Sequence, residues 1–458
     1  MDAVALNGVT YKPHSQTQFD TLDYHKILLV SCHFPPGGGI QVQRALGLAR
    51  YLPALGFKVH VLTARNPRVP AYDAALLQSI PNEVDVHRTV TLEPSFRLRK
   101  RLWGGASGSD SRNKHNTSRG KALAKRAALQ IAQRILSPDP QVLWLPTAMV
   151  EAERLVRRER IGIVIITAPP FSSFLIGHRL KSVFPDIRLI SDFRDEWLRY
   201  FVNNFAFRRC EYVEKRAAEI ERATVVVSDR IVAAAPAARD AIRCRYPDEP
   251  EEKFRTVSNG FDEDQFQSFR PRPRGAERII VAYVGTMHDA VSPAPYLDAL
   301  DRLPAEVSAR FETRFVGRIA EEFDRQILEN RKGKVVITPF VPHQEAIRQM
   351  EEADVLLSPC HDPLTIPGKV YEYLGTGRPI LAFGNAGGDV DQMIRRTRVG
   401  WCADPKDHIG IDSILTRLAT DPMARLTNPA AEEVAKFTRR HLTSVYASIV
   451  SSAVQSPL

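Results

Sequence analysis

The strongest evidence for a fold class lies in residues 358–384, which have the sequence SPCHDPLTIPGKVYEYLGTGRPILAFG. An apolar strand is expected to end at residue 359, and a helix is expected to begin near Pro367 and Gly368 after a loop. Gly377 is typical of the end of that helix, and another apolar strand follows it. A strand, a helix and a second strand in this order indicate an α/β unit.

The same alternation continues on both sides of this stretch. Further strands are expected in the second half of the chain, at residues 278–285, 312–317, 334–341, 353–359 and 378–384. Strands of the first half are expected at residues 26–30, 58–64, 161–168, 187–193, 223–228 and 253–260. Runs rich in Val, Ile and Leu that are separated by helices are typical of buried parallel sheets. The sequence therefore predicts two doubly wound, Rossmann-like α/β domains that face each other across a cleft.

Composition places the boundaries between these domains. Residues 267–278, QSFRPRPRGAER, are rich in Pro and Arg and are expected to form a linker. An N-terminal extension (1–24) and a first domain (25–266) precede it, and a second domain (279–429) follows. Residues 430–458 have an amphipathic helical pattern, and this C-terminal helix is expected to pack back on the first domain. Ligands of such folds bind at the carboxyl ends of parallel strands, so the cleft is the expected site.

Charge and cysteine content limit the class of protein. The chain has 458 residues and a net charge of +10, and residues 97–134 contain eleven Lys or Arg against one acidic residue. This basic stretch, with an insertion expected at about 97–126, suits an anionic membrane surface, although a solvated loop is the alternative. We expect no nucleic-acid partner, because no zinc-finger or RNA-binding motif is present. Five scattered cysteines and no visible signal or spanning segment favour a cytoplasmic protein, with the inner face of the membrane as a possible docking surface.

The helix that begins at Gly368 has the features of a diphosphate site. Free backbone N–H groups at a helix N-terminus favour phosphate, and Lys369 adds a positive charge where the helix dipole disfavours one. Glu372, one turn further, is suited to accept hydrogen bonds from ribose hydroxyls. The alternative for Lys369 is a solvated first-turn lysine without a ligand.

Several stretches together resemble the retaining GT-B glycosyltransferases, specifically their family 4, which assembles bacterial polysaccharides and glycolipids. Beside residues 358–384, the resemblance rests on HKILLVSCHFPPGGGIQVQR (25–44), SDFRDEW (191–197), VSNGFDEDQF (257–266), YVGTM (283–287) and FVGR (315–318). These pieces occur in the family's order and extend from about residue 25 to residue 450.

The resemblance implies a nucleotide-sugar donor on the second domain, a glycan or lipid-linked acceptor, and transfer with retention of configuration. It also implies that neither a metal ion nor another cofactor takes part. Glu372 matches the second glutamate of the family's Glu-seven-residues-Glu pattern, which contacts the donor ribose. The leaving diphosphate requires a cation, for which Lys369 is the first candidate and Arg318 the second. The remaining donor contacts are expected from Pro367, Gly368, Gly285, Thr286, Asn259, Phe340 and Val341.

Three positions depart from the family pattern. The first glutamate of the pattern is replaced by Leu364, which leaves the sugar open; a deoxyhexose would lose least from the missing carboxylate. Thr286 and Ser292 stand where family members often have an arginine and a lysine. These departures keep a second hypothesis open, in which a catalytically degenerate transferase-like protein binds a glycan or a partner.

The first domain supplies the other candidates, which follow apolar strands and are expected at the cleft: Gly37, Gly38, Gly39, His33, Asp192 and Arg194. The glycines would let the backbone approach donor phosphates or the acceptor, and a tight turn without a ligand is the alternative. Asp192, a candidate catalytic residue, and Arg194 would either position the acceptor or stabilise a loop through salt bridges.

An NAD(P)-dependent oxidoreductase is the competing enzyme class. Its G-x-G-x-x-G fingerprint requires a glycine at position 42, where the chain has Val42. No acidic residue ends the second strand either, although Arg65 there would suit a 2′-phosphate. The sequence therefore disfavours a dinucleotide site.

Overall fold

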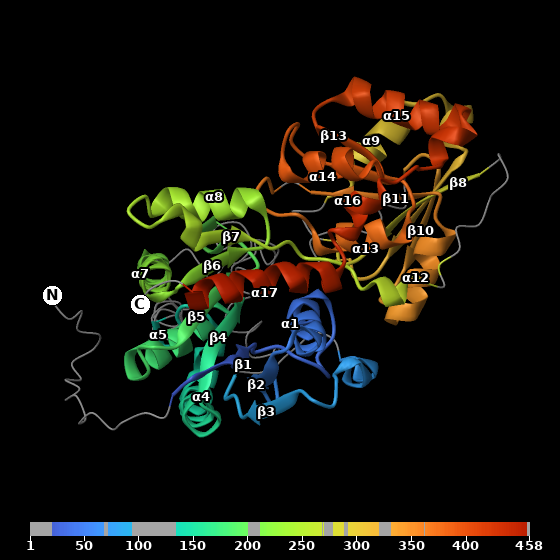
Figure 1. Ribbon diagram of the computed structural model, residues 1–458. Helices are drawn as coiled ribbons and strands as arrows, with labels where there is room; N and C mark the ends of the chain where they lie inside the picture. The colour runs from blue at the N-terminus through green and yellow to red at the C-terminus, as the bar shows by residue number, and fades with distance from the viewer. Residues whose placement is uncertain are drawn as a thin grey trace, which may run out of the picture.

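The fold consists of two α/β domains, which Figure 1 shows side by side, with the C-terminal helix lying along the first domain. In this computed structural model, the described residues are 21–67, 72–93, 134–199, 211–267, 269, 278–287, 292–319, 331–360 and 362–455. The extension predicted at 1–24 and the linker predicted at 267–278 lie almost entirely outside this part of the chain. The basic insertion predicted at 97–126 lies wholly outside it.

The first domain is built on a seven-stranded parallel sheet with the order β3-β2-β1-β4-β5-β6-β7. Its strands are β1 (Asp23–Val30), β2 (Lys58–Ala64), β3 (Asp85–Thr89), β4 (Ile161–Ala168), β5 (Arg188–Phe193), β6 (Arg230–Ala233) and β7 (Phe254–Thr256). The helices between them are α1 (Ile40–Tyr51), α4 (Leu145–Glu159), α5 (Phe174–Val183), α7 (Glu211–Val227) and α8 (Pro236–Arg245). Parallel pairing places the carboxyl ends of all these strands at one edge.

The second domain repeats this plan on a six-stranded parallel sheet with the order β10-β9-β8-β11-β12-β13. Its strands are β8 (Ile279–Val284), β9 (Phe311–Val316), β10 (Lys334–Thr338), β11 (Val355–Pro359), β12 (Ile380–Phe383) and β13 (Gly400–Ala403). Its helices are α9 (Ala294–Arg302), α10 (Ala305–Ser308), α12 (His343–Glu352), α13 (Gly368–Thr376), α14 (Asp389–Thr397) and α15 (His408–Thr420). The helix predicted near Pro367 is confirmed as α13, and Gly377 ends it with a positive φ of 63°.

One predicted strand is wrong. Residues 223–228 are not a strand but the last turns of α7, which ends at Val227. The buried residues Val213, Ala217, Ile220 and Thr224 recur at intervals of three or four, so a helical face outweighs the β-branched composition. The strand follows instead at β6. The short strands β3 and β13 were not predicted, because their residues are mostly half-buried and alternate weakly.

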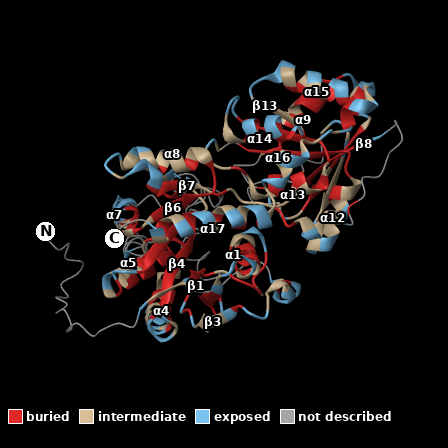
Figure 2. Ribbon diagram, in the orientation of Figure 1, coloured by how far each residue is buried: buried red, intermediate tan, exposed pale blue. Residues whose placement is uncertain are grey.

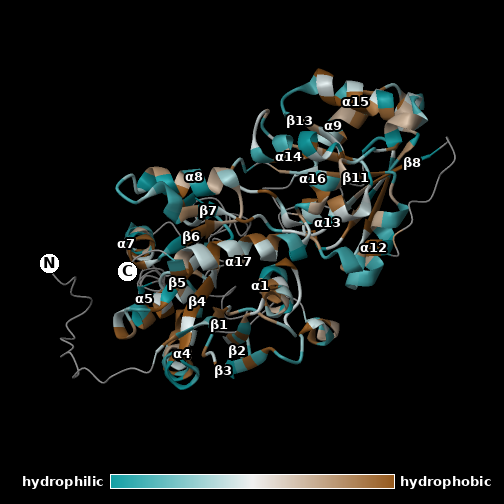
Figure 3. Cartoon of the chain, viewed as in Figure 1, coloured by the Kyte–Doolittle hydropathy of each residue, from teal (hydrophilic) through white to brown (hydrophobic). Residues whose placement is uncertain are grey.

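The central strands of both sheets are buried and mostly apolar, whereas the helices turn polar faces outward (Figures 2 and 3). All residues of β4 are buried, as are those of β5 and β11. Strands that are covered on both faces in this way form continuous apolar runs, which explains why the sequence pattern was so strong.

The C-terminal segment folds as α16 (Ala431–Ala435) and α17 (Arg439–Gln455), and α17 packs on the first domain beside α1. Tyr446 and Val450 of α17 belong to the same buried cluster as Ile27 of β1 and Ile163 of β4. A helix from the end of the chain thus completes the core of the domain at its beginning.

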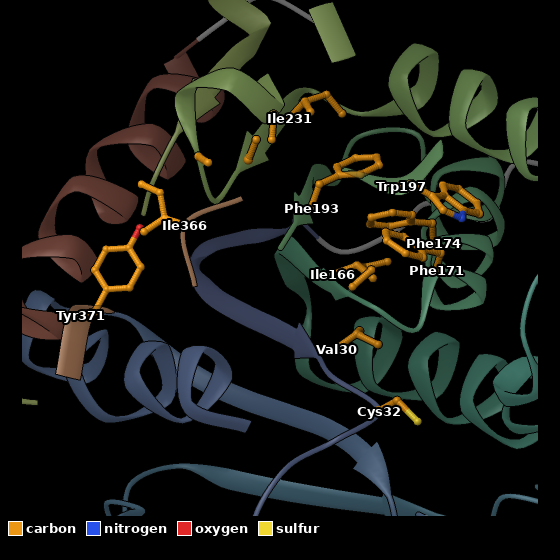
Figure 4. Close-up of a cluster of buried hydrophobic side chains, with 14 of the residues drawn as sticks. Val30, Cys32, Ile166, Phe171, Phe174, Phe193, Trp197, Ile231, Ile366 and Tyr371 are labelled. Atoms are coloured by element: carbon orange, nitrogen blue, oxygen red, sulfur yellow. The ribbon is translucent and has the colours of Figure 1, made fainter. Parts of the chain in front are cut away.

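The two domains share an apolar junction where the chain crosses between them. Phe261 and Phe437 lie on the two crossing segments, and the N–H of Phe261 donates to the carbonyl of Phe437 at 3.1 Å. One buried cluster contains first-domain residues such as Phe171 and Trp197 together with Tyr371 of α13, and Figure 4 shows several of its members. None of the described helices is long and apolar enough to cross a membrane.

We expect Tyr446→Ala to lower the free energy of unfolding by about 3–5 kcal/mol, because it empties a fully buried aromatic site between α17 and α1. Denaturant unfolding of the full chain measures this change. Ile409→Ala is the control: Ile409 is 84% exposed, and its truncation should change stability by less than about 0.5 kcal/mol. Equal effects of the two substitutions would contradict this account of α17.

Candidate functional site

The candidate site lies in the second domain, where the ends of β8 and β11 meet the beginning of α13. Lys369, in the first turn of α13, reaches the end of β8 and places its Nζ 3.6 Å from the centre of the Tyr283 ring. Gly285 follows directly, and a Cβ at this position would lie 3.3 Å from the Lys369 ammonium. The fold thus brings together residues more than eighty positions apart in the sequence.

The beginning of α13 leaves its backbone N–H groups available. Pro367 precedes the helix with extended backbone angles, and no side chain caps the helix. A proline at this position has no backbone N–H, and it marks the start of the helix. The uncapped N–H groups and the positive end of the helix dipole favour an anion beside Lys369.

The Lys369 ammonium has no counter-ion. Within the described residues, no hydrogen bond or ion pair reaches its Nζ, and the Tyr283 ring is its contact. Burial lowers the pKa of Lys369 to about 7, although the Cys360 thiol and the Glu372 carboxylate oppose this shift. Nearly all lysines lie at the surface or are paired, so a desolvated lysine without a partner is a candidate for anion binding.

Two glycines make room beside this lysine. Gly285 and Gly317 end β8 and β9 with φ angles of 152° and 135°, which side chains of L-residues rarely adopt. A Cβ on Gly317 would overlap the carbonyl oxygen of Gly285. The backbones therefore approach each other closely beside Lys369.

The other predicted donor residues lie along the same edge. Thr286 and Arg318 follow β8 and β9 and are exposed, and Phe340 and Val341 follow β10. Phe340 is 67% exposed, which is unusual for a large aromatic residue. Their order along the sheet runs from Phe340 at β10 to Lys369 beside β8 and β11, as an extended ligand on this edge would require.

Glu372 lies one turn after Lys369 and is half-buried. Electrostatic coupling also places it near Arg439, which is buried at the start of α17 and has Asp262 at 4.0 Å. Desolvation lowers the pKa of Arg439, and both acids oppose this shift. The Glu372 carboxylate therefore interacts electrostatically with the chain segment that returns to the first domain.

Across the cleft, the predicted glycine loop lies against this site. Gly37 and Gly38 are buried, and Gly39, with a φ of 84°, precedes α1. Ile40 then contacts the start of α13: a Cβ on Gly368 would lie 2.6 Å from Ile40 Cγ1. The predicted proximity of the two loops is therefore present, and the contact passes through Ile40.

Asp192 does not lie on the cleft surface. Its side chain is fully buried, and both carboxylate oxygens accept hydrogen bonds from Arg44 at 2.7 Å. Arg44 also donates to the carbonyls of Val257 and Ser258 and, at 3.5 Å, to the side chain of Asn259. Of the two interpretations of Asp192, the structure shows the salt bridge, and both oxygens of Asp192 are engaged by Arg44.

The side chain of Arg194 also forms hydrogen bonds within the first domain. Its guanidinium donates to the carbonyls of Gln41, in the first turn of α1, and Pro169, which follows β4, and so joins these two segments. The neighbouring Asp195 is half-buried, and burial raises its pKa to about 6; Arg194 opposes the shift and Asp362 of the second domain reinforces it. His33 is half-buried before the glycine loop, and its backbone carbonyl accepts from Ser31.

Sequence reasoning missed Arg44, Tyr283 and Asp362. Arg44 was visible as a cation between Val42 and Ala45, on the face of α1 that is buried. Asp362 lies two residues before Leu364, whose N–H donates to its Oδ1 at 3.0 Å. Nothing in the pattern distinguished Tyr283 from other strand residues. No group of three or more His, Cys, Asp or Glu that could hold a metal ion occurs among the described residues.

We expect Arg44→Met to cost about 3–5 kcal/mol of stability, because it leaves the Asp192 carboxylate buried without its partner. The double variant Arg44→Met/Asp192→Leu should recover much of this loss, since both charges are then removed. Urea unfolding of the three proteins gives the comparison. If the Asp192→Asn variant is instead stable but loses activity, Asp192 is again a candidate for contact with the substrate.

Comparison with known proteins identifies the fold. No family model and no curated protein matches the sequence. Anabaena Alr3699/HepE, solved in complex with UDP and glucose, is similar with a TM-score of 0.58 at 14% identity over 93% of this chain and 99% of that chain. A glycosyltransferase from Rickettsia africae ESF-5 gives 0.54 at 14% identity, over 94% and 99%. WaaG, a glycosyltransferase involved in lipopolysaccharide biosynthesis, gives 0.53 at 13% identity, over 93% and 98%.

At these identities the similarity establishes the architecture alone. The neighbours match nearly the whole length of both domains, and the two parallel sheets agree with them. The predicted fold class is therefore confirmed, and the chain has the two-domain, Rossmann-like GT-B fold.

Proposed function

We propose that this protein is a glycosyltransferase that moves a sugar from a nucleotide-sugar donor to a glycan or lipid-linked acceptor. The observation that carries the proposal is the ammonium of Lys369, a half-buried residue at the uncapped start of α13, which is desolvated and has no counter-ion among the described residues. A diphosphate supplies the negative charge that this position lacks, and it gains charge as it leaves.

The neighbours support a uridine donor as the first to test. Alr3699/HepE was solved with UDP and with UDP-glucose. In this chain we place the base near Phe340 and Val341, the ribose at Glu372 and the diphosphate between Lys369, Gly285 and the start of α13. Arg318 is a second cation at the same edge.

The finer features of the proposal rest on the resemblance of the motifs. We infer transfer with retention, without a metal ion, for cell-surface polysaccharide or glycolipid synthesis. Leu364 in place of a carboxylate favours a donor sugar that lacks a hydroxyl group, such as a deoxyhexose. The acceptor is assigned to the first-domain side of the cleft, near His33 and the glycine loop.

The second candidate function is that of a protein that binds a glycan or a partner without catalysing sugar transfer. Leu364, Thr286 and Ser292 favour it, because each replaces a charged residue of the family pattern. This candidate predicts no release of nucleoside diphosphate from any nucleotide-sugar.

Nucleoside diphosphates and their sugars are expected to raise the melting temperature, since a ligand that binds the folded state stabilises it. A thermal-shift panel of UDP, GDP, ADP and TDP, each with and without a sugar, identifies the base. Lys369→Met should weaken the affinity for the best nucleotide by about 10- to 100-fold, as expected for a charged hydrogen bond. Lys406→Met, at an exposed lysine of the same domain, is the control.

Lys369→Met has a second expected effect that separates lost binding from lost folding. The pKa of Lys369 is about 7 in the folded state, below that of an unfolded lysine, so protonation favours unfolding between these values. The variant should therefore melt at a higher temperature than the natural protein near pH 6, although it binds less nucleotide. No stabilisation of the natural protein by any nucleotide would refute the proposed function.

We further propose that the protein is cytoplasmic and docks on an anionic membrane surface through residues 97–134. This proposal rests on sequence alone, because nearly all of that stretch lies outside the described residues. Vesicles that contain anionic lipid should bind the protein at low salt. Binding should weaken when the salt concentration is raised to about the physiological level. Equal sedimentation with neutral vesicles would argue against the proposal.

A further inference from the structure

Tyr283 is buried in the second domain, with 1% of its surface exposed, and contacts Lys369 through the face of its ring. Its hydroxyl donates to the carbonyl of Thr286 at 2.7 Å, which fixes the ring against the turn that contains Gly285. Phe315 of β9 packs on the ring from another direction, with the centroids 6.3 Å apart. The orientation of the ring is therefore determined by its surroundings and not by Lys369.

The ring face is suited to a cation because the π-electrons above it carry partial negative charge. Burial raises the pKa of the Tyr283 phenol, so the ring remains neutral and forms no ion pair with the lysine. The other groups that act on Lys369 are the Cys360 thiol after β11 and Glu372 on α13 itself. Burial also raises the pKa of Cys360, to about 11, so the thiol carries no charge near neutral pH.

We propose that Tyr283 is a positioning residue: its ring holds the Lys369 ammonium in place from one side and leaves its remaining hydrogens for the diphosphate. The inference rests on the proposed function and adds to it the residue that contacts the ammonium when the site is empty. A carboxylate in this place would have to be displaced by the incoming phosphates. A neutral ring holds the cation without competing for it.

Two substitutions at Tyr283 separate the effect of the ring's charge distribution from the effect of its shape. Tyr283→Phe keeps the ring and removes the hydroxyl, and Tyr283→3,4,5-trifluorophenylalanine keeps nearly the same shape but removes the negative ring face. Reactivity of Lys369 toward acetic anhydride, followed by mass spectrometry across pH, reports its pKa without any nucleotide. Tyr283→Phe should leave the pKa near 7, whereas the fluorinated ring should lower it to about 6.

Nucleotide affinity should show the same dependence on pH. A lower pKa leaves less of the lysine charged near pH 7.5, so the fluorinated variant should bind UDP, or the nucleotide identified above, about tenfold more weakly than Tyr283→Phe there. Near pH 5.5 the lysine is mostly charged in both variants, and the affinities should converge. A general loss of packing would weaken binding equally at both pH values.

Each outcome decides the inference. An unchanged Lys369 pKa in the fluorinated variant, at an unchanged melting temperature, would overturn the role of Tyr283. A lowered pKa without nucleotide binding by any form of the protein would support the contact but refute the proposed function. Melting temperatures of both variants show that they fold, and Tyr283→Phe provides the matched reference if the hydroxyl itself affects stability.

Discussion

The cleft depends on the hydrogen bonds and the ion pair of the Arg44 guanidinium. It lies on α1, pairs with Asp192 at the end of β5 and donates to the carbonyls of the segment that leaves the first domain. The Tyr446 ring of α17 lies 6.0 Å from it. One buried cation thus joins segments from the beginning, middle and end of the chain, and it fixes α1, which presents Ile40 to the second domain. Buried pairs of this kind add little net stability, but losing one partner is costly.

The environment of a desolvated charge differs between the two domains. In the first domain, both oxygens of Asp192 accept hydrogen bonds from Arg44. In the second domain, Lys369 is desolvated without a counter-ion in the part of the chain that the structure describes, and the Tyr283 ring contacts its ammonium. An unpaired buried charge lowers stability, and such costs are concentrated at binding sites. This contrast is the physical reason to place the ligand's charge on the second domain.

The junction between the domains is apolar and narrow. Gly260 and Gly375 have no side chains where the crossing segments and α13 pack together: a Cβ on Gly375 would lie 2.6 Å from Phe266. Backbone hydrogen bonds of Phe261 with Phe437 and Arg439 join the two chain crossings. Because Ile40 touches Gly368, the glycine loop and the donor helix are in contact in this arrangement.

The sequence by itself determined the two parallel sheets, because strands that are buried on both faces have no polar positions to obscure their pattern. It also determined α13 and the position of Lys369, since a proline and a first-turn lysine are local signals. It could not distinguish the end of α7 from a strand, because β-branched residues occur in both. Only the tertiary structure decided that Asp192 is paired and Lys369 is not. Arg44 and Asp192 are 148 positions apart, and Tyr283 and Lys369 meet only where parallel strands end at one edge. Local patterns carry no information about such contacts.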